Sequence, residues 1–248
     1  MTGKGSFFWY ELASPDPAAS EAFYTAVVGW TAQPFEGGAG YTVLNAGSEG
    51  VGGIMAVQPG GKPGWNGYVQ VADTNAAAEA VRQAGGQVLY GPDDIPGVGR
   101  FAFLADPQGA SFSLLTPSSQ GEMPKAAPGA PGHIGWRELH TSDWESAFAF
   151  YSEQFGWAKS QAMDMGEMGT YQLFSDGGED VGAMMNSPNM PAPTWLFYFT
   201  VDSIEAAIGR INRGGGQVLM GPHEVPGGGW IVQGADPQGV MFALVGPK

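Results

Sequence analysis

Short stretches of alternating polarity cover much of this chain, and glycine, proline or asparagine usually separates them. Such stretches predict β-strands, because successive side chains of a strand point to opposite faces of its sheet. Two segments of the first half have helical spacing instead, residues 18–28 and 74–84. In the first half we expect strands over residues 7–12, 41–44, 51–57, 65–72, 87–90, 100–105 and 110–115.

The ends of both predicted helices carry recognisable signals. Asp16 is a good N-cap, and Pro17 after it suits the first turn of a helix. Gly29 is expected to end the first helix, and Gly85 with Gly86 the second, since glycine adopts the left-handed conformation common after helices. Each half of this segment therefore reads as strand, helix and further strands.

The chain then repeats itself. Gly-Gly-Gln-Val-Leu at 85–89 returns at 215–219, and Ala-Asp-Pro-Gln-Gly at 105–109 returns at 235–239. The offset is 127 between Gly5 and Gly132 at the start of the copies (132 − 5) and 130 between Gly85 and Gly215 (215 − 85). The second copy therefore contains a net insertion of three residues. A period this long indicates a duplicated domain. Helices are expected again near 144–155 and 203–213.

The duplication predicts two domains, residues 1–117 and 132–248, each built from two βαβββ units. A segment rich in proline and glycine, residues 118–131, is expected to link them. One chain then supplies four units, so no second copy is needed to complete a domain. We expect a monomer or a homodimer.

Composition narrows the classes of partner. The net charge of −14 disfavours nucleic acid and anionic membranes as partners. The chain has no cysteine, which excludes disulfides and thiolate nucleophiles. It lacks an N-terminal signal pattern and any run of about 18 apolar residues, so we expect a cytoplasmic protein without a membrane segment. The expected partner is a small molecule, for the reasons given below for the clefts.

Two motifs carry a resemblance to a known family. An aspartate before each copy's first helix, Phe-Tyr within it and Gly-Trp after it form the first. The second is Asp-Pro-Gln-Gly-x-x-Phe-x-Leu at 106–114 and again at 236–244. The chain resembles the vicinal oxygen chelate superfamily, which includes glyoxalase I, bleomycin and fosfomycin resistance proteins and extradiol dioxygenases. The resemblance implies an α+β fold with two tandem domains, each a curved, half-open sheet around a cleft.

Metal-using members of that family carry ligands at positions that this chain fills with other residues. By resemblance, those positions are Trp9 and Trp136 on first strands, Asn66 and Leu196 on later strands, and Ser113 and Ala243 in closing strands. Indole, aliphatic and hydroxyl side chains are poor ligands of divalent ions. We therefore expect no metal and no cofactor.

The candidate catalytic residues lie on the first strand of each copy. Alternation puts Trp9 and Glu11 on one face, and Trp136, Glu138 and His140 on the equivalent face. A carboxylate in a partly dry pocket suits a general acid or base, which makes Glu11 and Glu138 candidates. The alternative is that each glutamate is a structural anchor that accepts hydrogen bonds from backbone or tyrosine.

His140 has no counterpart, because the first copy has Ala13 there. With Glu138 it would form an acid–base pair or part of an unusual metal site; the alternative is a histidine that faces solvent at a strand end. His133 and His223 carry little functional weight.

Alternation also predicts the remaining residues of the two clefts. Aromatic and sulfur-containing side chains with few charges suit a flat apolar ligand, although an ordinary core would look similar. The expected ligand-binding residues are Trp9, Tyr41, Asn66, Tyr68, Gln70 and Ser113 in the first copy, and Trp136, Tyr171, Tyr198, Thr200 and Met241 in the second.

Two hypotheses of function follow. The chain binds a small hydrophobic or aromatic molecule without a metal, as the bleomycin-resistance branch of the family does. Alternatively, it is a lyase, isomerase or hydrolase that uses Glu138 with His140, or Glu11, as acid and base. The first hypothesis is preferred, because no cleft offers a metal site, a nucleophile or a cluster of charges.

Overall fold

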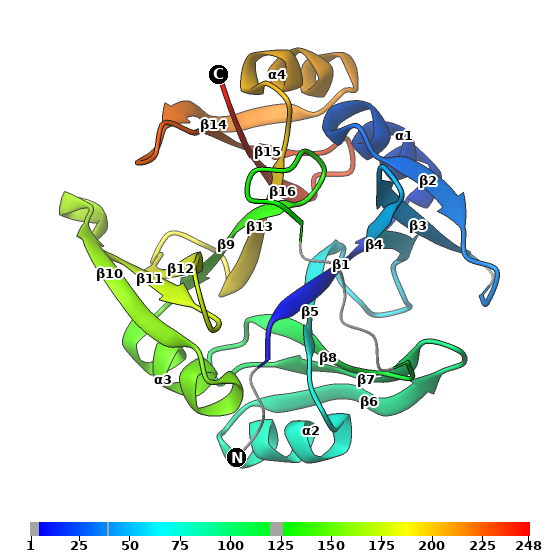
Figure 1. The fold of residues 1–248 in the computed structure, drawn as a ribbon, viewed down its shortest axis with the longest axis vertical. Helices are drawn as coiled ribbons and strands as arrows, with labels where there is room; N and C mark the ends of the chain where they lie inside the picture. The colour runs from blue at the N-terminus through cyan, green and yellow to red at the C-terminus, as the bar shows by residue number, and fades with distance from the viewer. Residues whose placement is uncertain (1–4, 39, 120–125) are drawn as a thin grey trace. The chain divides into compact units, whose positions relative to one another are not determined.

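The first copy of the duplicated sequence forms eight strands and two helices in the computed structural model, which describes residues 5–38, 40–119 and 126–248 (Figure 1). In chain order they are β1 (Phe7–Ser14), α1 (Pro17–Val28), β2 (Thr31–Pro34), β3 (Tyr41–Ala46), β4 (Glu49–Ala56), β5 (Gly64–Gln70), α2 (Thr74–Gln83), β6 (Gln87–Ile95), β7 (Gly99–Ala105) and β8 (Ser111–Pro117). The sequence analysis missed β2, whose residues are mostly exposed and show no apolar alternation.

The second copy repeats this order. It contains β9 (Ile134–Thr141), α3 (Trp144–Phe155), β10 (Ala158–Asp164), the short helix η1 (Gly166–Met168), β11 (Thr170–Ser175), β12 (Asp180–Asn186), β13 (Thr194–Thr200), α4 (Ile204–Arg213), β14 (Gln217–Glu224), β15 (Trp230–Ala235) and β16 (Met241–Gly246). None of the helices in the described part of the chain is long and apolar enough to cross a membrane.

Each copy contributes one eight-stranded sheet. The strand order is β2-β3-β4-β1-β5-β8-β7-β6 in the first sheet and β10-β11-β12-β9-β13-β16-β15-β14 in the second. Parallel pairs, such as β9 with β12, occur beside antiparallel pairs, such as β11 with β12. The predicted α+β class with two tandem copies is confirmed.

The predicted helix signals act as expected. Asp16 accepts a hydrogen bond from the Ala19 amide (3.1 Å), and Asp143 accepts one from the Ser146 amide (3.2 Å) at the start of α3. Gly29 follows α1 with a φ of 91°, a conformation that side chains with a Cβ rarely adopt. These local signals set where α1 and α3 begin and where α1 ends.

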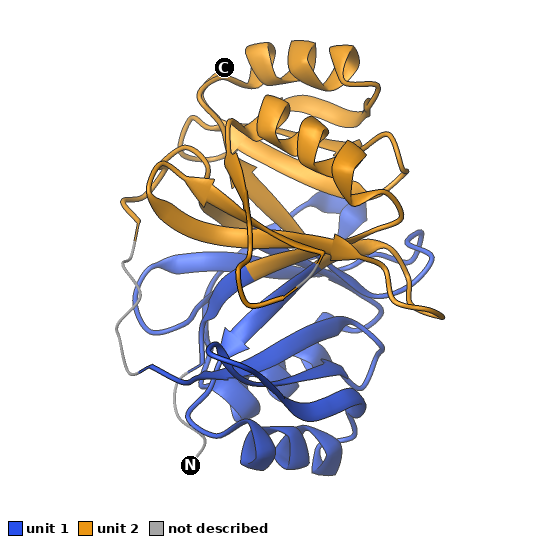
Figure 2. Cartoon of the chain, turned by 90° about the vertical axis from the view of Figure 1, so that its right-hand side faces the viewer, with its two compact units in different colours: residues 1–9, 66–123, 137–195 blue, residues 10–65, 124–136, 196–248 orange. Residues whose placement is uncertain are grey.

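Packing divides the chain into two compact units (Figure 2). Unit 1 consists of the described residues within 1–9, 66–123 and 137–195, and unit 2 of those within 10–65, 124–136 and 196–248. Each unit thus combines segments from both copies. The division into domains 1–117 and 132–248 describes the duplication and stays a prediction, and residues 120–125 of the expected linker lie outside the described residues.

A chain of buried hydrogen bonds joins the segments of unit 1. The Trp195 indole donates to the Tyr151 hydroxyl (2.9 Å), which donates to Oδ2 of Asp106 (3.1 Å). Oδ1 of Asp106 accepts from the amides of Gln108 (2.8 Å) and Ala110 (2.9 Å). One carboxylate therefore organises its own turn and holds a helix of the other copy.

Unit 2 contains the same arrangement. The Trp65 indole donates to the Tyr24 hydroxyl (3.0 Å), which donates to Asp236 (3.2 Å). Tyr24 is fully buried, as is Tyr151 in unit 1. The recurrence of the contact in both units indicates an architectural role.

Burial changes the acidity of these groups. It raises the pKa of the Asp106 carboxyl, against the effect of the hydrogen bonds that the carboxyl accepts. Burial, followed by the charge of Asp106, raises the pKa of Tyr151 well above its usual 10.0. Tyr151 therefore remains a hydrogen-bond donor at neutral pH.

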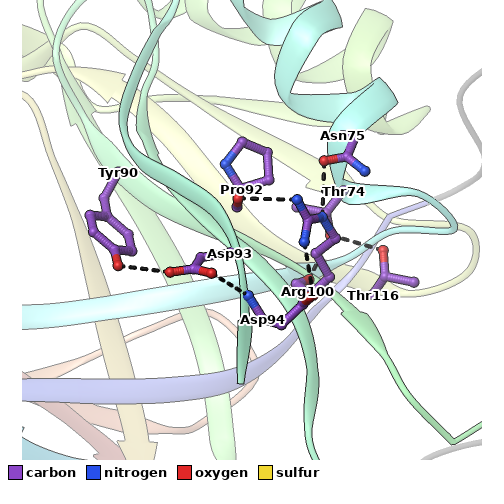
Figure 3. A network of polar contacts seen from close by, with 8 residues as sticks. All are labelled: Thr74, Asn75, Tyr90, Pro92, Asp93, Asp94, Arg100 and Thr116. Atoms are coloured by element: carbon purple, nitrogen blue, oxygen red, sulfur yellow. Dashed lines mark hydrogen bonds and ion pairs between the residues drawn. The ribbon is translucent and has the colours of Figure 1, made fainter. Parts of the chain in front are cut away.

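A polar network at the surface of unit 1 contrasts with this buried chain (Figure 3). The Arg100 guanidinium donates to Asp94 (2.9 Å) and to Asn75 (2.9 Å), and the Tyr90 hydroxyl donates to Asp93 (3.0 Å). The Asp94 side chain is 71% exposed, so its ion pair with Arg100 contributes at most about 1 kcal/mol. The network orders the β6–β7 hairpin without anchoring the unit.

We expect Tyr151→Phe to lower the free energy of unfolding by about 1–3 kcal/mol, because Oδ2 of Asp106 loses its donor and the Trp195 indole its acceptor. Tyr90→Phe is the matched control and should change it by less than about 0.5 kcal/mol, because Tyr90 is exposed. Urea unfolding measures both. Equal effects of the two substitutions would contradict the architectural role.

Stability should also depend on pH through Asp106. Since its folded pKa lies above the usual 3.8, its contribution is present below that value and is lost as pH rises through the folded pKa. The free energy of unfolding of the wild type relative to Asp106→Asn should therefore fall as pH rises above about 3.8. Urea unfolding across this range tests it, and a relative stability that rises with pH would be the opposite result.

Candidate functional site

Two candidate residues meet on β9. Glu138 and His140 lie on one face of this strand, as the alternation predicted, and Nε2 of His140 is 2.7 Å from Oε1 of Glu138. The His140 side chain is 12% exposed and the Glu138 side chain 8%. The alternative that His140 faces solvent at a strand end is therefore wrong. The pair is largely shielded, where a charge-assisted hydrogen bond is stronger than in water.

Two further hydroxyl groups contact this pair. The Tyr171 hydroxyl donates to Oε2 of Glu138 (2.7 Å), in keeping with the expectation that the glutamate anchors a tyrosine. Ser187 Oγ lies 2.7 Å from Nδ1 of His140. The structure therefore brings together a hydrogen-bonded group, which we call the Glu138 chain: Tyr171, Glu138, His140 and Ser187.

Strand register places Ser187 there. In the parallel β9–β12 pair, Met185 aligns with His140, and the Ser187 amide donates to the Thr141 carbonyl (2.8 Å) just beyond β12. The sequence analysis missed Ser187. The first copy has the same strand pairing: Met55 aligns with Ala13, and the Val57 amide donates to the Ser14 carbonyl. The apolar Ala13 and Val57 therefore occupy the positions that His140 and Ser187 occupy in the second copy.

Gln108 holds the end of β9 in place. Its Oε1 accepts from the Thr141 hydroxyl (2.9 Å) and the Asp143 amide (2.8 Å), and its Nε2 donates to the Asp143 carbonyl (2.7 Å). Thr141 directly follows His140. The Asp-Pro-Gln-Gly turn therefore fixes the backbone next to the imidazole.

A small pocket opens beside the Glu138 chain. Its volume is about 100 Å³, and its lining includes His140 and Ser187 with the apolar Pro188, Met190 and Pro193. Ligand pockets usually measure about 300–1,000 Å³. This pocket therefore admits one small group of a ligand.

Other side chains occupy the positions at which the resemblance implies metal ligands. In unit 2, Leu196, Tyr198 and Ala243 form a buried apolar cluster, and Trp136 packs against it. Hydrocarbon fills these positions, so they do not fit a metal. No group of three or more histidine, aspartate or glutamate side chains suited to an ion occurs in the described part of the chain.

The equivalent positions of the first copy are polar. On β5, Asn66 donates from Nδ2 to Ser113 Oγ on β8 (2.8 Å), and Ser113 is 1% exposed. Tyr68, which aligns with Ser113, is also buried. Oδ1 of Asn66 is buried and has no hydrogen-bond partner among the described residues. An amide and a hydroxyl are weak donors for a divalent ion, so this pair does not fit a metal either.

The other predicted residues divide between the units. Trp9 and Gln70 belong to unit 1, whereas Glu11, Tyr41, Thr200 and Met241 belong to unit 2. The Tyr41 ring lies directly over Gly53, the strand neighbour of Glu11. A Cβ at position 53 would collide with that ring, so the glycine makes room for it. Met241 is 37% exposed and Thr200 is buried.

The predicted Tyr198 has a partner of its own, as does His133, to which the sequence analysis gave little functional weight. Tyr198 accepts a hydrogen bond from Gln233 Nε2 (2.7 Å). His133 Nε2 pairs with Oε2 of Glu49 (3.0 Å). Neither contact adds a residue to the Glu138 chain.

Comparison with known families matches both copies. The model of the Glyoxalase/Bleomycin resistance protein/Dioxygenase superfamily matches residues 131–244, and that of a glyoxalase-like domain matches residues 9–115. CFP32 of Mycobacterium tuberculosis, which is named as a glyoxylase, is 32% identical over 252 residues, covering 98% of this chain and 95% of that protein.

Two relatives from Streptomyces have a similar identity to this chain. The anthracycline biosynthesis protein DnrV of Streptomyces peucetius is 33% identical, over 97% of this chain and 93% of its own length. DauV of Streptomyces sp. (strain C5), with the same description, is 32% identical, over 97% and 93%.

Solved structures share the fold at low identity. A Mn(II)-bound glyoxalase from Novosphingobium aromaticivorans has a TM-score of 0.73 at 17% identity, covering 99% of this chain and 83% of that chain. An extradiol ring-cleaving dioxygenase from B. fuscum has a TM-score of 0.69 at 16% identity, covering 96% and 70%. At these identities the likeness extends to the fold alone.

We expect the purified chain to retain no stoichiometric divalent ion, because indole, aliphatic, amide and hydroxyl side chains occupy the positions described above. Elemental analysis before and after dialysis against a chelator measures the content. Thermal unfolding with added Mn²⁺, Zn²⁺ or Ni²⁺ should show an unchanged midpoint. One ion per chain, or a midpoint that rises with one of these ions, would contradict the prediction.

Proposed function

The chain belongs to the glyoxalase/bleomycin resistance protein/dioxygenase superfamily, and on this premise we propose that it binds a small hydrophobic or aromatic molecule at Asn66 and Ser113. One buried atom carries this proposal: Oδ1 of Asn66 has no hydrogen-bond partner among the described residues. A buried acceptor without a partner costs about 1–3 kcal/mol. A hydroxyl or N–H group of a ligand would recover that cost.

The surroundings of this acceptor favour an uncharged ligand. Ser113 holds the other side of the Asn66 amide, and the neighbouring Tyr68 is buried and aromatic. Leu196 and Ala243 stand at the equivalent positions of the second copy and belong to a closed apolar cluster. The ligand is therefore assigned to the first copy.

The relatives support an aromatic ligand. Two of them are named for anthracycline biosynthesis, and each covers nearly all of this chain. Anthracyclines combine flat aromatic rings with hydroxyl groups, a chemistry that suits a buried acceptor beside aromatic side chains.

A second candidate function is supported by a different observation. The contact between His140 Nε2 and Glu138 Oε1 (2.7 Å), in a largely shielded position, is the geometry of a general acid–base pair. In this reading the chain is an enzyme in which the pair moves a proton at a bound small molecule. Glu138 and Tyr171 would hold the imidazole in one orientation.

Titration with a fluorescent anthracycline tests the proposed ligand site. Asn66→Ala should weaken binding about tenfold, the equivalent of one hydrogen bond of about 1.4 kcal/mol. Asn75→Ala, which alters an exposed asparagine of α2, is the matched control and should bind as the wild type does. Circular dichroism checks that both variants fold.

Two results would count against the site. The wild type would fail to bind the anthracycline, or Asn66→Ala would bind it as tightly as Asn75→Ala does. In either case the unpaired oxygen of Asn66 has no part in recognising this class of ligand.

A further inference from the structure

We propose that Ser187 is a nucleophile activated by His140, and that Ser187, His140 and Glu138 form a catalytic triad for hydrolysis of esters with a small acyl group. This inference rests on the acid–base pair of the second candidate function and is independent of ligand binding at Asn66. Both imidazole nitrogens are engaged, Nε2 by Glu138 and Nδ1 by Ser187, each at 2.7 Å. A base that contacts a nucleophile through one nitrogen and an orienting carboxylate through the other is the arrangement of such a triad.

In the proposed triad the direction of both hydrogen bonds follows from an ionised Glu138 and a neutral His140. An ionised carboxylate only accepts, so Glu138 requires a proton on Nε2 of His140. In the neutral imidazole Nδ1 then carries a lone pair, and the Ser187 hydroxyl donates to it. Tyr171 donates to the second oxygen of Glu138, which keeps that carboxylate facing the imidazole. His140 is thus prepared to take the proton of Ser187.

Rigid elements hold these groups. Glu138 and His140 belong to β9, and the Ser187 amide donates to Thr141 in continuation of the β9–β12 pairing. Gln108 of the first copy accepts a hydrogen bond from the Thr141 hydroxyl and so also holds this residue. Groups fixed in this way lose little freedom when a substrate binds, which favours catalysis.

The pocket limits the substrate. Ser187 and His140 line a space of about 100 Å³ together with Pro188, Met190 and Pro193. That space admits an acetyl group or one of similar size, whereas an aromatic acyl group exceeds it. The alcohol portion of the ester would extend out of the pocket, so its size is not restricted by this lining.

The ester and water are the only reactants that this hydrolysis requires. Oγ of Ser187 bonds to the carbonyl carbon while its proton passes to Nδ1 of His140. The bond from that carbon to the alcohol oxygen then breaks, and the leaving alcohol takes the proton from Nδ1. Water attacks the acyl-serine with His140 as base, and Ser187 leaves with its proton restored. The products are a carboxylic acid and an alcohol.

p-Nitrophenyl acetate is the probe for this reaction. The wild type should release a rapid burst of p-nitrophenol, and mass spectrometry with peptide mapping should find one acetyl group per chain, on Ser187. Ser187→Ala should abolish the burst and lower hydrolysis by about a hundredfold or more. Ser146→Ala, an exposed serine of α3 whose hydroxyl donates to Asp143, is the matched control and should retain the burst.

Glu138 is a positioning residue in this scheme and needs a different readout. Glu138→Gln should still be acetylated on Ser187, but the acylation rate should fall by about 10²–10⁴-fold with KM nearly unchanged, because the wrong tautomer of His140 is favoured. The pH profile of acylation should change as well, which loss of packing alone would not produce.

Three outcomes would overturn the inference: no acetyl group on the wild type, acetylation at another residue, or a burst that survives Ser187→Ala. Hydrolysis that requires His140 without any acyl-serine would also overturn it, while leaving the acid–base pair of the second candidate function intact. Anthracycline titration of Ser187→Ala reports on the ligand site at Asn66 separately.

Discussion

The buried hydrogen bond from a tyrosine hydroxyl to an aspartate is the contact on which each unit depends. In unit 1, Asp106 accepts amide protons within its own turn and the hydroxyl proton of Tyr151 from the other copy. Its burial is costly, and the accepted hydrogen bonds offset that cost. Gln108 in the same turn fixes Thr141, the residue after His140. The contact that stabilises the unit therefore also positions the candidate catalytic group.

The two copies of the sequence have diverged at the same structural positions. Where the second copy pairs His140 with Ser187, the first has Ala13 and Val57, although the strand pairing is equivalent. Two methyl-bearing side chains cannot transfer a proton. The proposed acid–base chemistry is therefore assigned to the second copy.

The divergence has the opposite sense at the positions where the resemblance implies metal ligands: here the first copy is the polar one. The first copy retains hydrogen-bonding side chains in Asn66 and Ser113, while Leu196 and Ala243 join an apolar cluster in the second. A buried amide with an unpaired oxygen is costly unless something binds to it, whereas hydrocarbon requires no partner. We therefore propose that the first copy recognises a ligand and the second carries out chemistry, on a fold that supports many activities.

The sequence by itself determined the features that depend on near neighbours. The α+β class, the helix starting at Asp16 and the shared face of Glu138 and His140 follow from strand alternation and capping, which act within a few residues. Only the tertiary structure decided that Ser187 meets His140, because a strand register joins residues far apart in sequence. It also decided that Tyr151 of one copy pairs with Asp106 of the other. The repeated segments bury similar apolar faces, so their pattern does not determine which segments pack together.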